Sequence, residues 1–227
     1  ILKFYNIFIQ VYDYYNDYLI KKSLLDFNDM INKTIELLEN QPQIREKYQK
    51  MFSHICIDEY QDVSSSQVEL IKILLSEKNS LFAVGDDWQS IYSFRGAEVS
   101  YIVDFKKQFK NTEQIILPYN YRSSKNIVDA STIIINKNKN KIIKKIKAQN
   151  KDKNEKIFQF NALNEKDGAQ FIINTTQKLL EQDYKIDDFF LLYRRSHQIQ
   201  QYKSYFAKYN FNIPLKTIHS AKGQEAK

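Results

Sequence analysis

Two neighbouring carboxylates, Asp58 and Glu59, are the residues in this sequence best placed to do chemistry. They open the run DEYQD, residues 58–62, directly after the apolar residues 55–57. An apolar run that ends in acids is typical of a buried parallel strand, whose carboxyl end faces the crevice where α/β proteins bind ligands. There one acid can hold Mg²⁺ while its neighbour polarises an attacking water. An acidic cluster on its own is more often a solvated turn, so this run needs further support.

A second cluster follows another apolar run, residues 81–84. Residues 85–97, GDDWQSIYSFRGA, combine acids and an amide with three aromatic side chains and an arginine in one short loop. Exposed aromatic rings stack on nucleic-acid bases of any sequence, and arginine adds contacts to phosphate. The alternative is that Trp88, Tyr92 and Phe94 are core residues, and for Trp88 we favour that alternative.

Two further clusters are weaker when each is taken alone. Residues 119–124, YNYRSS, open a helix, and an arginine there can stabilise charge on a transferring phosphoryl group, as arginine fingers do. Arg122 could equally be a surface residue beside capping serines. Residues 217–225, TIHSAKGQE, form a strand followed by a turn marked by glycine, and they indicate little by themselves.

The elements that must position these clusters alternate between helices and strands. Residues 1–50 are predicted to be helical, with a break at Pro42, and Ser64, Ser65 and Ser66 are N-cap candidates for a helix that runs to Leu75. Such alternation predicts an α/β fold with mostly parallel sheets. The strands are expected at 55–57, 81–84, 115–117, 157–160, 189–193 and 215–218, and the later helices at 124–136, 165–180 and 198–209.

Composition excludes some classes of protein. Hydrophobic residues make up 43% of the 227 residues and charged residues 27%, which is typical of a globular chain and not of a disordered one. The sequence shows no leader and no apolar run near the roughly 20 residues that span a bilayer, so we predict a cytoplasmic protein without a membrane partner. A single cysteine, Cys56, excludes an internal disulfide, and we interpret it as core packing.

The net charge of +7 permits binding to nucleic acid, although the signal is weak because lysine and asparagine are common throughout the chain. The lysine- and asparagine-rich stretch that ends at Lys156 is interpreted as a solvated loop and helix surface.

Together, the order, spacing and strand-end placement of the four clusters resemble helicase superfamily 1, of the UvrD, Rep and PcrA type. DEYQD resembles motif II of that family, GDDWQSIYSFRGA motif III, LPYNYRSS motif IV and TIHSAKGQE motif V. Weaker matches, LDFND at 25–29 and LYRR at 192–195, extend the resemblance over nearly the whole chain. Trp88 and the closing Glu225-Ala226 resemble the helicase IV branch more than UvrD itself.

The resemblance implies two RecA-like domains of the P-loop NTPase class, both incomplete. Residues 1–112 would be the C-terminal part of the first domain with a remnant of its helical insertion. Residues 113–227 would be the second domain, truncated after motif V. The implied function is ATP-dependent 3′–5′ DNA unwinding or translocation in repair or recombination, with ATP and Mg²⁺ as cofactors and single-stranded DNA as partner.

The resemblance also implies a role for each matching residue. Asp58 would hold Mg²⁺, Glu59 would activate water, Gln89 would sense the γ-phosphate, and Arg122 would contact it. In the rest of the site, Tyr121 would stack on the adenine and Glu225 would reach the ribose, while DNA would contact Tyr92, Phe94, Arg95, Thr217 and His219.

The sequence departs from the family pattern in ways that predict a fragment. The phosphate-binding loop G-x-x-x-x-G-K-[ST] is absent, since no glycine precedes Gly85, and so is the final arginine motif. Gln224 replaces a leucine. We therefore expect both ends to be cut, and missing motor segments or a partner chain to complete the site. We also expect no ATP hydrolysis by the chain alone. The alternatives are a non-catalytic nucleic-acid-binding remnant of a truncated gene and a helicase IV relative that acts on RNA polymerase.

Overall fold

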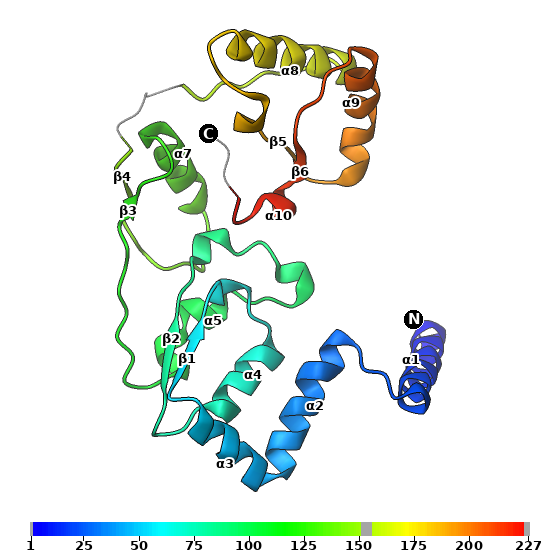
Figure 1. The fold of residues 1–227 in the computed structure, drawn as a ribbon, viewed down its shortest axis with the longest axis vertical. Coiled ribbons are helices and arrows are strands. Elements are labelled where there is room, and N and C mark those ends of the chain that lie inside the picture. Colours follow the sequence, from blue (N-terminus) through cyan, green and yellow to red (C-terminus); the bar gives the residue numbers. More distant parts are fainter. Residues whose placement is uncertain (1, 151–155, 225–227) are drawn as a thin grey trace. The chain divides into compact units, whose positions relative to one another are not determined.

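The computed structural model describes residues 2–150 and 156–224 (Figure 1). The chain forms two compact units. Unit 1 comprises Ile1–Ile116 and Ile135–Lys144, and unit 2 comprises Leu117–Ile134 and Lys145–Lys227. Each unit is described by itself.

Unit 1 begins with three helices whose ends follow from local capping signals. Asp26 caps the second helix, because its Oδ1 accepts a hydrogen bond from the Asp29 amide at 2.8 Å and the Asp29 carboxylate accepts one in return. Pro42 begins the third helix at a position where its missing N–H costs nothing. The predicted break at Pro42 is confirmed. The helices are α1 (Leu2–Lys22), α2 (Phe27–Asn40) and α3 (Pro42–Met51).

The centre of unit 1 is a parallel pair of strands, β1 (His54–Ile57) and β2 (Ser80–Ala83), joined by α4 (Ser65–Leu74). Ser64 caps α4 as predicted, in a capping box with Gln67. The core is formed by Tyr60, Val63, Val68 and Ile71, against which the short helices α5 (Ser100–Val103) and α6 (Phe105–Gln108) pack side chains such as Phe105.

Unit 2 has two more parallel pairs. β3 (Tyr119–Asn120) pairs with β4 (Lys147–Ala148), and β5 (Leu191–Tyr193) pairs with β6 (Leu215–Thr217). Its core contains Ala169, Ile173, Phe206 and Ile213. The helices are α7 (Lys125–Ile135), α8 (Glu165–Leu180), α9 (Ser196–Lys208) and α10 (Ile218–Ala221). The predicted α/β fold with parallel strands is confirmed.

Two of the predicted strands are wrong. Within the described residues, 115–117 and 157–160 form no strand, and their apolar side chains are exposed. An apolar run becomes a strand only when a neighbouring strand takes its backbone hydrogen bonds. Here the pairing starts at Pro118, whose carbonyl accepts from the Lys147 amide at 2.7 Å.

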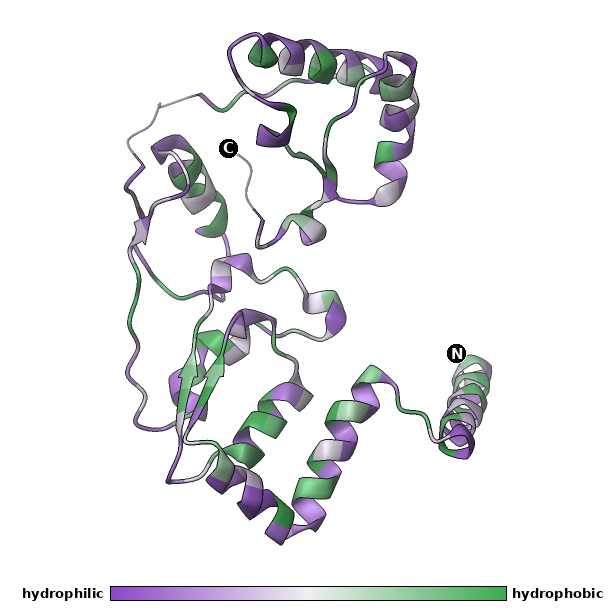
Figure 2. Cartoon of the chain, viewed as in Figure 1, coloured by the Kyte–Doolittle hydropathy of each residue, from purple (hydrophilic) through white to green (hydrophobic). Residues whose placement is uncertain are grey.

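The interpretation of Cys56 as core packing is also wrong, because its side chain is exposed. Successive residues of a strand face opposite sides, so Ile55 and Ile57 are half-buried while Cys56 between them is not. After His54 and Ser80, their first residues, β1 and β2 are apolar (Figure 2). Such a run predicts a strand without telling which of its faces is covered. In the described part of the chain, no helix has both the length and the apolar character needed to cross a bilayer.

Candidate functional site

The acid pair lies where β1 ends and the chain turns sharply. Glu59 has a φ of 52°, a left-handed conformation that is uncommon outside glycine, and the 3₁₀ turn Tyr60–Asp62 follows it. Oδ1 of Asp58 accepts a hydrogen bond from the Glu59 amide at 2.8 Å, which supports the turn. Both carboxylates are exposed. Strain of this kind is concentrated at functional sites.

Gln61 connects this turn to the next loop, which we call the 85–96 loop. Its side chain is completely buried. Nε2 donates to Glu59 Oε2 at 2.5 Å, and Oε1 accepts from the Asp86 amide at 2.8 Å. Gly85 leaves room for this contact, since a Cβ there would lie 2.6 Å from Gln61 Oε1 and 2.8 Å from Ile102 Cδ1 and would force a shift. Sequence reasoning gave Gln61 no role, because a glutamine among acids in a turn carries no local signal of such a bridge.

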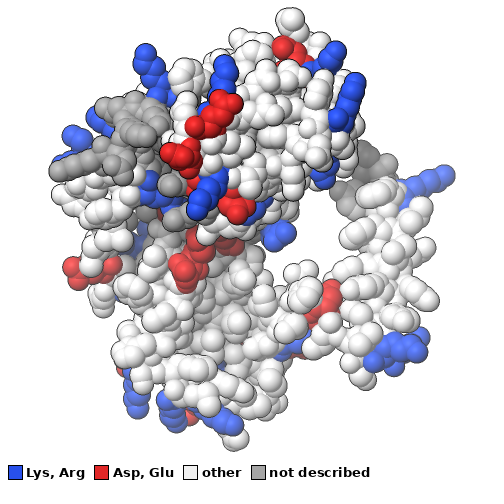
Figure 3. All heavy atoms as spheres, turned by 45° about the horizontal axis from the view of Figure 1, so that its top comes forward, with Lys and Arg blue, Asp and Glu red and all other residues white. Residues whose placement is uncertain are grey.

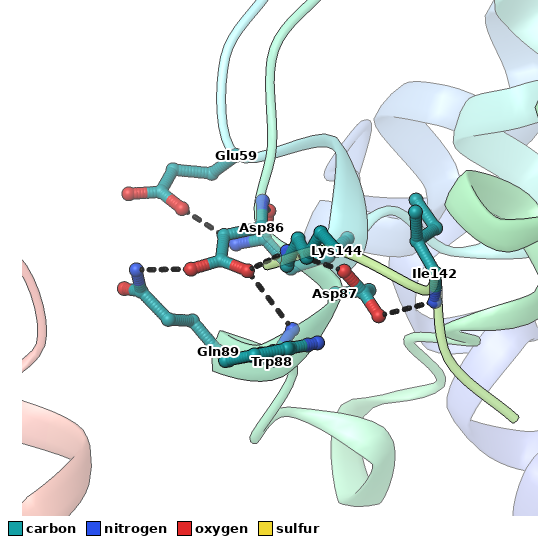
Figure 4. A network of polar contacts seen from close by, with 8 residues as sticks. Glu59, Asp86, Asp87, Trp88, Gln89, Ile142 and Lys144 are labelled. Atoms are coloured by element: carbon teal, nitrogen blue, oxygen red, sulfur yellow. Dashed lines mark hydrogen bonds and ion pairs between the residues drawn. The ribbon is translucent and has the colours of Figure 1, made fainter. Parts of the chain in front are cut away.

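Asp86 holds the side chain of Gln89. Asp86 caps the 3₁₀ turn Asp87–Gln89 by accepting from the Trp88 amide at 3.1 Å, and its Oδ2 accepts from Gln89 Nε2 at 2.9 Å (Figure 4). The Gln89 side chain is otherwise exposed. The amide predicted to sense phosphate is thus fixed at a defined position in an open loop.

The two acids of the 85–96 loop share one lysine, Lys144. Its Nζ lies 2.5 Å from Asp86 Oδ1 and 2.7 Å from Asp87 Oδ1, and it lies over the Trp88 ring, 4.9 Å from the centroid. The Ile142 amide donates to Asp87 Oδ2 at 2.8 Å (Figure 4). Only 11% of the Lys144 side chain is exposed and 1% of that of Asp87. The interpretation of the lysine-rich stretch as solvated surface is therefore wrong for Lys144, which pairs with the buried Asp87 and the partly exposed Asp86.

Two opposing effects act on the pKa of Asp86. Burial alone would raise the pKa, but hydrogen bonds from Lys144 and Gln89, the charge of Lys144 and the Trp88 amide outweigh burial and hold the pKa below its ordinary value. Asp86 is therefore a carboxylate near neutral pH and accepts from both partners.

The aromatic residues of the 85–96 loop lie outside the core clusters. Trp88 is half-buried beneath Lys144, so the expected core position is only partly reached. Phe94 is 64% exposed, and its centroid lies 6.1 Å from that of Tyr92. Cζ of Arg95 lies 5.3 Å from the Tyr92 centroid and 5.7 Å from that of Phe94. An arginine beside exposed rings is a surface on which bases can stack.

In unit 2, Tyr121 and Arg122 project from the turn after β3. Oδ1 of Asn120 accepts from the Arg122 and Ser123 amides at 3.0 and 2.8 Å, and Nδ2 of Asn150 donates to the Arg122 carbonyl at 3.1 Å. These bonds hold the backbone. Both side chains are exposed, that of Tyr121 by 74%.

The last cluster lies at the end of β6. Thr217 caps α10, with Oγ1 accepting from the Ser220 amide at 3.0 Å, and the His219 ring lies against Arg194 Nη1 at 3.1 Å. Gln224, which replaces an expected leucine, interacts with Lys216 and donates to the Ser220 carbonyl at 2.9 Å. Glu225 lies outside the described residues.

Parallel α/β units whose strands end in acidic, amide-bearing and arginine-bearing loops define the class of this chain, which is that of RecA-like P-loop NTPase domains. Residues 3–110 match the UvrD/REP helicase N-terminal domain, and residues 115–222 match the UvrD-like helicase C-terminal domain. The chain belongs to the UvrD/Rep helicase family.

Three relatives illustrate the match. The ATP-dependent DNA helicase PcrA of Leuconostoc citreum is 34% identical over 219 residues, covering 96% of this chain and 29% of that protein. PcrA of Staphylococcus aureus is 38% identical over 200 residues, 88% of this chain and 27% of that protein. DNA helicase II of Haemophilus influenzae is 37% identical over 190 residues, 84% and 26% respectively. The chain thus spans little more than a quarter of these relatives, and the helicase IV branch stays a prediction.

Proposed function

We propose that this chain is the part of an ATP-driven DNA helicase that senses the nucleotide and binds single-stranded DNA. One observation carries the proposal. The 85–96 loop holds both Gln89, fixed by Asp86, and the exposed ring of Phe94, five residues further on. A change at the phosphate can therefore move the stacking surface through a single short loop, which is what a translocating motor needs.

The residues present suit Mg²⁺ and ATP. Mg²⁺ takes one or two carboxylates and completes its shell with water and phosphate oxygens. Asp58 and Glu59 offer hard oxygen ligands beside a groove of about 410 Å³ in unit 1. Asp58 would hold the ion, which would neutralise phosphate charge, and Glu59 would accept a proton from the attacking water. The sequence contains no G-x-x-x-x-G-K-[ST] loop, so the phosphates would be cradled by another segment of the protein or by a partner chain.

In unit 2, Arg122 would stabilise charge on the transferring phosphoryl group and Tyr121 would stack on the adenine. Glu225 would reach the ribose. Both described side chains, Tyr121 and Arg122, are exposed to solvent, which supports this assignment. We propose that residues 1–112 belong to one motor domain and residues 113–227 to a second.

Single-stranded DNA would contact Tyr92, Phe94 and Arg95 in unit 1, and Thr217 and His219 in unit 2. The exposed aromatic ring of Phe94 and its neighbours Tyr92 and Arg95 support this proposal better than net charge does. On the face drawn in Figure 3, lysine and arginine lie scattered among acidic and uncharged residues and form no continuous patch. Translocation polarity follows from family membership alone, and a cytoplasmic location stays a prediction from the sequence.

Paired variants in the intact protein that contains this chain test the proposal. Glu59→Gln is expected to lower DNA-stimulated ATP turnover by about 10²-fold or more, as loss of a general base does, while leaving single-strand affinity unchanged. Phe94→Ala is expected to weaken single-strand binding by about 1–3 kcal/mol, the value of one base–aromatic contact. Phe27→Ala, a change at another exposed phenylalanine of unit 1, is the control.

Turnover is measured by phosphate release and affinity by fluorescence anisotropy of a labelled oligonucleotide. Equal loss of both properties in both variants would refute the division of roles. Binding that Phe94→Ala leaves intact would exclude the stacking surface.

A further inference from the structure

Lys144 is the last residue of a short segment that belongs to unit 1. Residues Ile135–Lys144 belong to unit 1, although the segments before and after them belong to unit 2. At the end of this segment the lysine side chain is almost completely buried against Asp86 and Asp87. A buried cation between two carboxylates is costly to form and costly to disrupt, because removing it leaves buried charge uncompensated.

The Asp86 carboxylate links Lys144 to Gln89. Oδ1 is held by Lys144 Nζ, and Oδ2 accepts from Gln89 Nε2 at 2.9 Å. Fixing the first oxygen fixes the rotation of the carboxylate and therefore the position of the second. Lys144 thereby helps to set where the Gln89 amide lies without touching it, together with the Trp88 amide, which donates to the same oxygen at 3.1 Å.

We propose that Lys144 is a positioning residue for Gln89, because it orients the sensor amide through Asp86. The inference rests on the proposed function of Gln89. It adds a residue that no family motif quoted above contains.

The first test uses Lys144→Met, which removes the charge but keeps much of the length, in the intact protein. The exposed neighbour Lys145 supplies the control, Lys145→Met. A sensor amide acts on the transition state more than on bound ATP. Lys144→Met should therefore lower kcat by on the order of 10- to 100-fold, the cost of misplacing a group by roughly 1 Å, with KM for ATP changing much less. The control should match the wild type.

The second test repeats Lys144→Met in a Gln89→Ala background. If the lysine acts through Gln89, it should lower kcat no further there. A further loss equal to that in the wild-type background would overturn the proposal, as would a rise in KM with kcat unchanged.

A third measurement separates this inference from the proposed function. Hydrogen exchange by mass spectrometry should show faster exchange in the 85–96 loop of Lys144→Met, with α4 and the Lys145→Met protein unchanged. A wild-type protein without DNA-stimulated ATPase would refute the proposed function, and exchange would still decide whether Lys144 holds the loop. Unchanged exchange in that loop would refute the inference.

Discussion

The loop of unit 1 that carries Gln89 and the turn of unit 2 that carries Arg122 are held in different ways. The 85–96 loop is fixed by a completely buried glutamine, Gln61, and by Lys144, both distant in sequence. Hydrogen bonds to Asn120, two residues before it, and from Asn150 hold the backbone of the turn at Arg122. The first arrangement rests on buried polar side chains, whereas the side chains of Tyr121 and Arg122 in the second are exposed to solvent.

This difference has a physical basis. A sensor must have a defined resting position for a change in phosphate to be detected, and buried ion pairs and buried amides supply one. An arginine that contacts transition-state charge can remain solvated until the nucleotide is bound, because its guanidinium retains its charge at any accessible pH. The two loops therefore predict different responses to mutation.

The largest expected effect is on turnover, from Arg122→Ala. We expect ATP turnover by the intact protein to fall by about 10³-fold or more, the usual value of an arginine finger. Stability should change by less than about 0.5 kcal/mol, because the side chain is exposed. Steady-state kinetics and thermal unfolding measure the two quantities.

The control is Lys125→Ala, three residues away, whose ion pair with Asp129 is exposed. A large loss of stability in Arg122→Ala would show that the Arg122 side chain helps to hold its turn, as buried side chains hold the 85–96 loop. The proposed difference between the two loops would then be wrong.

The next prediction compares Gln61 and Asn120, the side chains whose oxygens accept backbone hydrogen bonds in the two loops. Gln61→Ala leaves the Asp86 amide without its buried acceptor, so unit 1 should lose roughly 1–3 kcal/mol. Asn120→Ala removes a turn acceptor that water can replace, so unit 2 should lose about 1 kcal/mol or less. Peptide-resolved hydrogen exchange reports each unit separately. Equal losses would contradict the ranking.

The last comparison is between two glycines, Gly85 of unit 1 and Gly168 of unit 2. A Cβ at Gly85 would meet Gln61 Oε1 at 2.6 Å and Ile102 Cδ1 at 2.8 Å, so Gly85→Ala should cost about 1–3 kcal/mol through overpacking. A Cβ at Gly168, within α8, would meet the Tyr202 hydroxyl at 2.7 Å. That end of a side chain can move, and alanine favours the helix by about 1 kcal/mol, so Gly168→Ala should be near neutral.

Thermal unfolding of both proteins, followed by circular dichroism, measures the difference. If Gly85→Ala left the melting temperature unchanged, Gln61 would be shown to shift easily. That result would contradict the proposal that the 85–96 loop is rigid.

Local signals accounted for most of the correctly predicted elements. The parallel pair around residues 55–57 and 81–84, the break at Pro42 and the cap at Ser64 follow from residue period and from side chains within three residues of a helix end. The strands predicted at 115–117 and 157–160 failed because an apolar run does not reveal whether another strand will pair with it.

The sequence by itself determined which residues follow the strand ends, among them the acid pair, the amide and the arginine. The family resemblance then predicted a role for each of these residues. Only the tertiary structure decided how they are held. Gln61 reaches Asp86 across 25 residues and Lys144 reaches it across 58, one a glutamine among acids and the other a lysine among many lysines. Neither has a local signal, because the partners of a buried polar group are set by how distant segments fold back on one another.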